Sequence, residues 1–147
     1  MESTFRFGRE IKVISNLLKR QIGNYESGKY VDEVTGSNAF IIGYLADHAH
    51  TDVFQKDLED IFSVRRSTMS GIILRMEQKG FLVRTPVDYD ARLKKIVLTD
   101  KGEAIHALME SNLAAAEQKL IKGFSDGEKE ALFSLLQKLR TNLEAES

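Results

Sequence analysis

The sequence contains no cysteine and only one proline, and both absences narrow what the chain can be. Without cysteine there is no disulfide, no thiolate zinc site, no cysteine nucleophile and no thiol redox sensor. Because proline interrupts helices and Pro86 stands alone, long helices are permitted almost everywhere else. The two absences favour a helical protein whose chemistry does not depend on thiols.

Long hydrophobic runs and an excess of one charge are absent as well. The longest apolar run, residues 40–46, is far shorter than the ~20 residues that span a bilayer, and the first residues mix charged with apolar side chains, unlike a signal peptide. The 147 residues include 21 basic and 22 acidic side chains, so the net charge is −1. We therefore expect a cytoplasmic protein without a membrane partner, formed by one domain or by one domain with helical extensions.

Apolar residues recur at steps of three and four along most of the chain, which predicts helices. The expected helices span residues 7–25, 38–48, 55–62, 65–79, 99–120 and 126–143. Short strands are expected at residues 53–54, 81–85 and 95–98, with the polar residues 86–94 as an exposed loop. The expected helix caps are Thr35 or Ser37, Gly80, Thr99, and a capping box of Ser125 and Glu128.

The order of these elements predicts a fold that is mostly α with a small β wing. Residues 36–98 would form a winged helix-turn-helix domain, residues 1–35 an N-terminal dimerisation helix, and residues 99–147 C-terminal dimerisation helices. Apolar stripes on both ends must be buried somewhere, and a two-fold dimer would bury them. Partial packing of the two ends against each other within one chain is the alternative.

Positive charge is concentrated in the middle of the chain. Residues 63–95 carry eight basic and three acidic side chains, a net charge of +5, so the remaining residues carry −6. A basic face favours phosphate binding, because neutralised phosphates release condensed counterions. A solvated helix face with a lysine-rich edge strand is the alternative. The coincidence of this charge with a helix-turn-helix pattern favours double-stranded DNA as the partner.

The helix expected from Arg65 begins with residues suited to DNA. Small hydroxyl side chains let a helix approach base edges, and arginines bind guanine or phosphate. Two arginines at the positive end of a helix dipole are unfavourable by themselves, and an external anion would explain them. On the expected wing tip, Arg92 suits the minor groove, and Asp90 could orient its guanidinium. The candidate DNA contacts are Arg66, Ser67 and Thr68 near bases, Arg75 and Lys94 on phosphates, and Arg65, Ser70 and Arg92.

Four stretches carry a family resemblance: residues 58–70, residues 75–82, the wing motif Asp90-Ala91-Arg92, and residues 98–102. Together they resemble the MarR family of bacterial winged-helix transcription regulators, and the resemblance extends over nearly the whole chain. Its most specific part is Asp-x-Arg followed by Leu-Thr-x-x-Gly. Two positions depart from the family pattern, because Ser63 replaces the usual glycine of the turn and Glu59 replaces a small residue.

The resemblance implies a homodimeric repressor of a pseudo-palindromic operator, held together by the first helix and the last two. It implies that residues 67–75 read the major groove and that Arg92 enters the minor groove. In many relatives a small phenolic or other aromatic ligand binds between the dimerisation and DNA-binding regions and releases DNA. The candidate effector residues here are Arg20, Tyr25, Tyr44 and His48, with a core Tyr44 and a solvated His48 as the alternative.

Other functions find little support in the sequence. His48, His50 and Asp52 have a loose metal-ligand spacing, but no His-x-x-Glu-His pattern is present, so we expect no metal and no cofactor. There is no glycine-rich phosphate loop and no nucleophile motif, so we do not expect an enzyme. The alternatives to a DNA-binding regulator are a winged-helix module that binds an acidic protein and a metal-responsive regulator.

Overall fold

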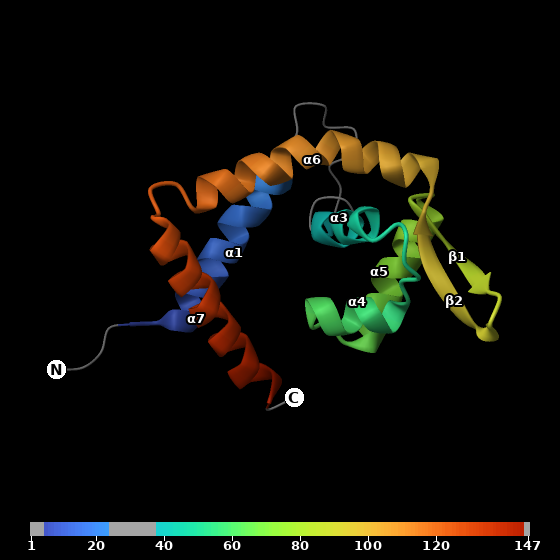
Figure 1. Cartoon of the computed structure of the whole chain (residues 1–147), viewed down its shortest axis with the longest axis horizontal. Coiled ribbons are helices and arrows are strands. Elements are labelled where there is room, and N and C mark those ends of the chain that lie inside the picture. The colour runs from blue at the N-terminus through green and yellow to red at the C-terminus, as the bar shows by residue number, and fades with distance from the viewer. Residues whose placement is uncertain (1–4, 24–37, 146–147) are drawn as a thin grey trace.

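The computed structural model describes residues 5–23 and 38–145, and its elements follow the predicted order. Helix α6 arches over the molecule, with α3, α4, α5 and a β-hairpin under one end and α1 and α7 under the other (Figure 1). The predicted helices are confirmed to within a few residues at their ends. The elements are α1 (Phe7–Gly23), α3 (Ala39–Asp47), α4 (Gln55–Phe62), α5 (Arg66–Gln78), β1 (Leu82–Val87), β2 (Asp90–Leu98), α6 (Asp100–Leu120) and α7 (Asp126–Glu144).

The hydrophobic core lies where α3, α4, α5 and the hairpin meet the N-terminal half of α6. Helix α3 is apolar on almost every side, but it leaves Phe40 41% exposed. The residues that it buries in the core are Ala39, Ile41, Ile42 and Leu45. Helix α5 instead buries one stripe at helical spacing, which includes Met69 and Ile73. Each fully buried apolar side chain contributes about 2 kcal/mol, so this packing holds the helix-turn-helix together.

Most of the predicted capping residues lie at the ends of helices. The Thr99 hydroxyl accepts a hydrogen bond from the Gly102 backbone N–H over 3.1 Å, and Ser125 and Glu128 form the predicted capping box. Gly80 follows α5 with a positive φ of 81°, as expected of a C-terminal cap. Asn38 is the N-cap of α3, and the predicted caps Thr35 and Ser37 lie outside the described residues.

The wing is longer than predicted, and the prediction of a loop at residues 86–94 is wrong. Strand β1 extends to Val87 and β2 begins at Asp90, so only two residues form the turn. Pro86 pairs with Lys94 in the antiparallel register, and the register shifts directly after it. Most of the hairpin's residues stay in solvent on both faces, so its strands lack the apolar alternation by which strands are recognised. Arg92 and Lys94 therefore lie on β2 rather than in a loop.

Residues 53–54 do not form the predicted short strand. Val53 is buried, and its carbonyl accepts one hydrogen bond from the Ile96 backbone N–H over 2.7 Å. One bond fastens the segment to β2 without making a ladder. The apolar character of Val53 thus reflects burial beneath the wing rather than strand pairing.

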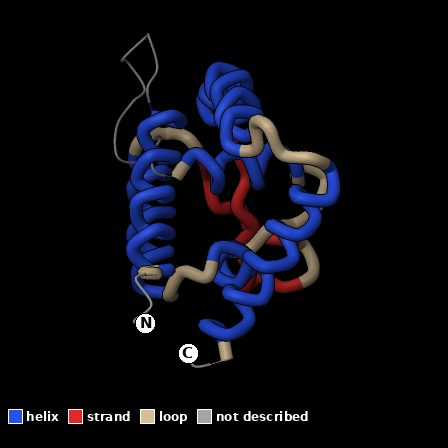
Figure 2. Tube along the Cα trace, turned by 90° about the vertical axis from the view of Figure 1, so that its left-hand side faces the viewer, coloured by secondary structure: helices blue, strands red, loops and turns tan. Residues whose placement is uncertain are grey.

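The two terminal helices have different surroundings. Helix α1 lies along α6, where Lys119 Nζ donates to Gln21 Oε1 over 3.2 Å. Helix α7 buries none of its residues, although leucines recur on one of its faces. The two helices cross in projection in Figure 1, but they lie apart in the perpendicular view of Figure 2. Within residues 5–23 and 38–145, no helix combines the length and the apolar character needed to cross a bilayer.

Candidate nucleic-acid interface

The turn between α4 and α5 depends on Ser63. This residue has a left-handed conformation with φ 53° and ψ 48°, and the next backbone N–H, of Val64, donates to the Glu59 carbonyl over 3.0 Å. These features close α4 and reverse the chain before α5 begins. A serine in this conformation costs about 1 kcal/mol relative to a right-handed one. Ser63 therefore occupies a position that glycine would fill without strain.

Helix α5 presents a polar face opposite its buried stripe. Its N-cap, Arg65, makes no capping hydrogen bond with its side chain, so the first N–H groups of α5 are not capped by that residue. A helix N-terminus with uncapped donors and nearby arginines attracts anions. All eight predicted DNA contacts are exposed, namely Arg65, Arg66, Ser67, Thr68, Ser70 and Arg75 around α5 and Arg92 and Lys94 on β2.

A basic groove of about 510 Å³ separates α5 from the wing. It brings together Arg66 and Ser70 from the helix with Arg92 and Lys94 from β2, four of the predicted contacts. Glu59 is the one carboxylate in its lining, against five cations. The full lining, which we call the wing groove, is Phe54, Gln55, Lys56, Glu59, Arg66, Ser70, Arg84, Arg92, Leu93 and Lys94.

Two arginine–carboxylate pairs hold cationic side chains at the wing groove. Asp90 accepts hydrogen bonds from the Arg92 backbone N–H at 2.9 Å and from its guanidinium at 3.1 Å, which lowers the pKa of Asp90 and raises the pKa of Arg92. Asp90 thus orients this guanidinium, as predicted, although Arg92 remains 90% exposed. Arg84 Nη2 donates to Glu77 Oε1 over 2.8 Å, and this hydrogen bond lowers the pKa of Glu77.

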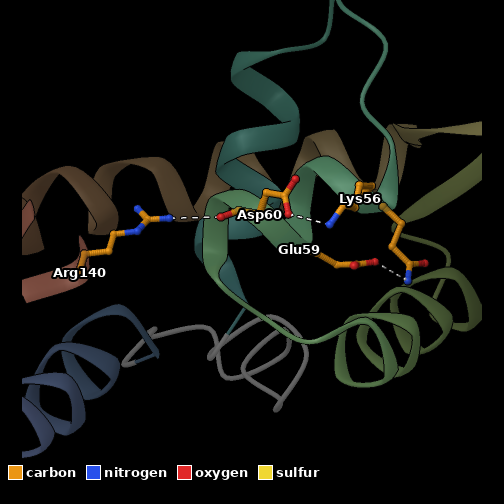
Figure 3. A network of polar contacts seen from close by, with 5 residues as sticks. Lys56, Glu59, Asp60 and Arg140 are labelled. Carbon is orange, nitrogen blue, oxygen red and sulfur yellow. Dashed lines mark hydrogen bonds and ion pairs between the residues drawn. The ribbon is translucent and has the colours of Figure 1, made fainter. Parts of the chain in front are cut away.

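A second groove, of about 520 Å³, adjoins the start of α5 and is lined by Arg65, Arg66 and the C-terminal Glu144, among others. Nearby, Arg140 of α7 reaches the last turn of α4 (Figure 3). Its Nη2 donates to the carbonyls of Ile61 at 2.7 Å and Asp60 at 3.2 Å. Carbonyls at a helix C-terminus have no partner within the helix, and a guanidinium satisfies them. Arg140 therefore connects α7 directly to the helix-turn-helix.

Sequence reasoning did not select three residues that the fold brings into the wing groove: Gln55, Lys56 and Arg84. Gln55 and Lys56 begin α4, and the packing of α4 on α5 places Gln55 beside Ser70 and Lys56 in the same groove. Arg84 lies on the strand opposite Ile96. Its position in the basic segment was the available signal, whereas nothing local marks Gln55. Of the predicted contacts, Ser67, Thr68 and Arg75 lie on α5 but not in either groove's lining.

The family model for MarR matches residues 33–93, which include the helix-turn-helix and most of the wing. The HTH-type transcriptional regulator YybA of Bacillus subtilis is 27% identical over 136 residues, covering 92% of this chain and 87% of the relative. The chain is thus similar to the MarR family in its helix-turn-helix and most of its wing. This is a family of transcription regulators, not of enzymes.

Solved structures of a transcription regulator and of a protein–DNA complex share the fold. The transcription regulator MarR from Oenococcus oeni PSU-1 superposes with a TM-score of 0.81 at 26% identity, over 92% of this chain and 99% of that one. A DNA complex of MepR from S. aureus has a TM-score of 0.78 at 24% identity, over 95% and 98% of the two chains. The predicted architecture, a mostly helical winged helix with long helical ends, is therefore confirmed.

The four predicted effector residues do not lie together in one site among the described residues. Tyr44 and His48 stack with ring centroids 3.9 Å apart, and His48 Nδ1 lies 2.9 Å from the Tyr44 carbonyl. Tyr44 lines a cleft of about 460 Å³ between α3, α4 and α6, whereas His48 borders a smaller cavity beside β2. Arg20 is exposed on α1, and Tyr25 lies outside the described residues. Tyr44 and His48 thus stack on each other but line different cavities.

His48, His50 and Asp52 border the cavity beside β2, which has a volume of about 180 Å³. No cluster of three or more metal-ligating side chains occurs in the part of the chain that the structure describes. Asp52 is engaged by the wing instead, because it accepts a hydrogen bond from the Tyr89 hydroxyl over 2.9 Å and lies 3.6 Å from Lys95 Nζ. Its carboxylate thus serves to hold the wing against the loop after α3.

Proposed function

We propose that this chain is a MarR-family regulator that binds a pseudo-palindromic DNA operator as a cytoplasmic homodimer and represses transcription from it. The wing groove is the observation that carries the proposal, because it collects five cations between α5 and the wing in a chain whose net charge is −1. Such a groove matches the phosphate backbone on both sides of a helix lying in the major groove. Repression rests on the family resemblance.

The positions of the side chains support the contact roles that we propose. Ser67 and Thr68 are small and exposed near the start of α5, so they can approach base edges together with Arg66. We assign phosphate contacts to Arg75, which lies in the last turn of α5, and to Lys94, which lies on β2. Arg92 projects from the wing with its guanidinium held by Asp90, which suits the narrow and negative minor groove.

The homodimer would bury the apolar faces of α1 and α7. Phe133 is 65% and Leu143 73% exposed, and Phe7 on α1 is 70% exposed. Contiguous exposed apolar surface of this kind marks an interface. A second copy covers it in a two-fold arrangement, which presents two copies of α5 about 34 Å apart, one turn of DNA.

A small aromatic effector would enter the cleft between α3, α4 and α6. Phe40, Tyr44 and Phe62 offer it ring contacts, and His106 Nδ1 in its lining is buried without a hydrogen-bond partner. A ligand that binds one arrangement of these helices better than another shifts the population between DNA-binding and DNA-free states. A phenol that releases bound duplex from the wild type, but not from the Tyr44→Ala variant, would support this part of the proposal.

The first experiment is selection of duplexes from a random-sequence pool at about 150 mM salt. We expect an inverted repeat with half-site centres ~10 bp apart. Arg92→Ala should weaken binding to the selected duplex. Lys122→Ala is the matched control, because it removes the same charge from the turn between α6 and α7, at the other end of α6 from the wing (Figure 1).

Two outcomes would contradict the proposal. Weak binding that is blind to sequence and equally affected by both variants would assign the basic surface to non-specific attraction. Binding of an acidic protein that duplex DNA does not displace would favour the protein-interaction module instead.

A further inference from the structure

Glu59 is an unusual neighbour for a DNA-binding surface, because it is the one carboxylate lining the wing groove. Its carboxylate is half-buried and points along α4 toward the start of that helix (Figure 3). There Glu59 Oε2 accepts a hydrogen bond from Gln55 Nε2 over 3.2 Å. The same nitrogen lies 2.8 Å from Ser70 Oγ on α5. Gln55 therefore connects a carboxylate on α4 to a hydroxyl on α5.

The carboxylate decides which end of the Gln55 amide faces it. An ionised carboxylate only accepts hydrogen bonds, so the amide must turn its NH2 group rather than its oxygen toward Glu59. That NH2 group has two hydrogens, and Glu59 and Ser70 are its closest acceptors. The hydrogen bond to Ser70 therefore runs in one direction, from Gln55 as donor to the serine oxygen as acceptor.

This direction controls what the Ser70 hydroxyl can still do. Its oxygen receives the Gln55 N–H, so its own hydrogen is directed elsewhere. A serine in a helix commonly donates to the carbonyl one turn earlier, which here belongs to Arg66. The Gln55 amide also lies 3.5 Å from that carbonyl, at the edge of hydrogen-bonding distance. Among the described residues the Ser70 hydroxyl donates no hydrogen bond to that carbonyl or to any other acceptor, so this exposed hydroxyl is left to donate into the groove.

We propose that Glu59 and Gln55 act as a positioning pair that makes Ser70 a hydrogen-bond donor toward DNA. The inference rests on the proposed function and deepens it. As a donor, Ser70 can form hydrogen bonds with phosphate oxygens, guanine N7 and O6, adenine N7 or thymine O4. It disfavours the amino groups of cytosine and adenine, which are donors themselves. The pair also supplies a reason for an acidic residue at position 59, where the family resemblance leads one to expect a small residue.

A double-mutant cycle on the full-length protein tests the inference. Gln55→Glu keeps the shape of the side chain but replaces the donating NH2 group with an acceptor, so Ser70 would turn its hydrogen toward position 55 instead of DNA. Ser70→Ala removes the hydroxyl altogether. Gln78→Glu is the matched control, because it makes the same chemical change and adds the same charge in the last turn of α5.

We expect Gln55→Glu and Ser70→Ala each to weaken binding to the selected duplex roughly fivefold per half-site. In the Ser70→Ala background, Gln55→Glu should weaken binding to the selected duplex no more than the Gln78→Glu control does. If Ser70 donates to a base, Ser70→Ala relaxes the preference at one position of each half-site. If Ser70 donates to phosphate, Ser70→Ala weakens all duplexes alike and leaves the selected sequence unchanged.

The inference is overturned if Gln55→Glu weakens binding by the same factor with and without the Ser70 hydroxyl, or has no more effect than Gln78→Glu. A wild-type protein that selects no duplex overturns the proposed function instead, and this is seen before any variant is made. Equal thermal midpoints for all variants show that the cycle reports on binding and not on folding.

Discussion

The winged-helix core and the C-terminal helix α7 carry similar apolar patterns but have opposite surroundings. Ile73 in α5 is completely buried, whereas Leu143 in α7 is 73% exposed. Both belong to apolar stripes at helical spacing. The core stripe meets other helices of the same chain, while the described residues leave most of the α7 stripe exposed. An amphipathic stripe therefore shows that a face will be buried, but it does not show by what.

Helix α6 belongs to both regions, so the boundary between them runs through one element. Ile105 and Met109 are buried against the winged helix, whereas Leu120 near the other end is 42% exposed. A helix shared in this way joins the outer helices to the helix-turn-helix. Arg140 adds a second link, through the carbonyls at the end of α4. Substitutions on either side of this boundary should act on different properties.

The largest effect is expected inside the core, at Gly102. A Cβ atom there would lie 2.1 Å from the Phe81 carbonyl oxygen, and backbone cannot move aside cheaply. Gly102→Ala should lower the free energy of unfolding by about 3 kcal/mol, measured by urea denaturation. Gly8→Ala in α1 is the control, since nothing lies within 4 Å of its added Cβ, and it should be neutral or slightly stabilising. Equal losses at the two sites would show that α6 does not pack tightly on the Phe81 backbone just before β1.

Next in size is a change on the α7 stripe, which should affect association rather than folding of the chain. Leu136→Glu places an unpaired carboxylate in the proposed dimer interface, so the dissociation constant of the dimer should rise at least ~100-fold. Analytical ultracentrifugation measures this rise. Thr141→Glu adds the same charge on the opposite face of α7 and should leave the dimer intact. A monomeric wild type, or equal dissociation of both variants, would remove α7 from the interface.

A smaller effect, of opposite sign in the two regions, is expected from serine-to-glycine changes. Ser63→Gly relieves the left-handed conformation at the turn and should raise the free energy of unfolding by about 0.5–1 kcal/mol. Ser134→Gly in the middle of α7 should lower it by about the same amount, because glycine weakens helices. Thermal midpoints compare the two. Destabilisation by Ser63→Gly would mean that the serine side chain holds the turn.

The smallest effect concerns pH. The hydrogen bond from Arg84 holds the folded-state pKa of Glu77 below its ordinary value. The pair therefore contributes stability above the unfolded-state pKa of Glu77, and this contribution is lost as pH falls through the lower folded-state pKa. Both side chains are partly exposed, so the contribution should be below about 1 kcal/mol.

Glu77→Gln should narrow the stability difference between about pH 7 and about pH 3 in urea titrations. Arg84→Met should reduce this difference in stability by the same amount. The double variant should show no further reduction beyond that of either single variant. Additive changes would show that the two residues act independently.

Much of the fold follows from local features of the sequence. The three- and four-residue spacing placed the helices, and Thr99 and Ser125 were found as caps because a helix start needs a side-chain acceptor within one turn. The wing was underestimated for a physical reason. Most residues of the hairpin stay in solvent, so few of its positions carry the burial signal that marks a strand.

The candidate site, like the fold, was predicted from the sequence only in part. Residue type alone drew attention to Arg66 and Ser70, since arginines and small hydroxyls at the start of a helix suit DNA. Their companions in the wing groove, Lys56 and Arg84, come from α4 and β1, and only packing brings them to α5. The sequence by itself determined the order of helices, their caps and the basic segment, because these depend on neighbours one turn away. Tertiary structure alone decided the groove and the direction of the Ser70 hydrogen bond, because both depend on atoms from elements that meet only after folding.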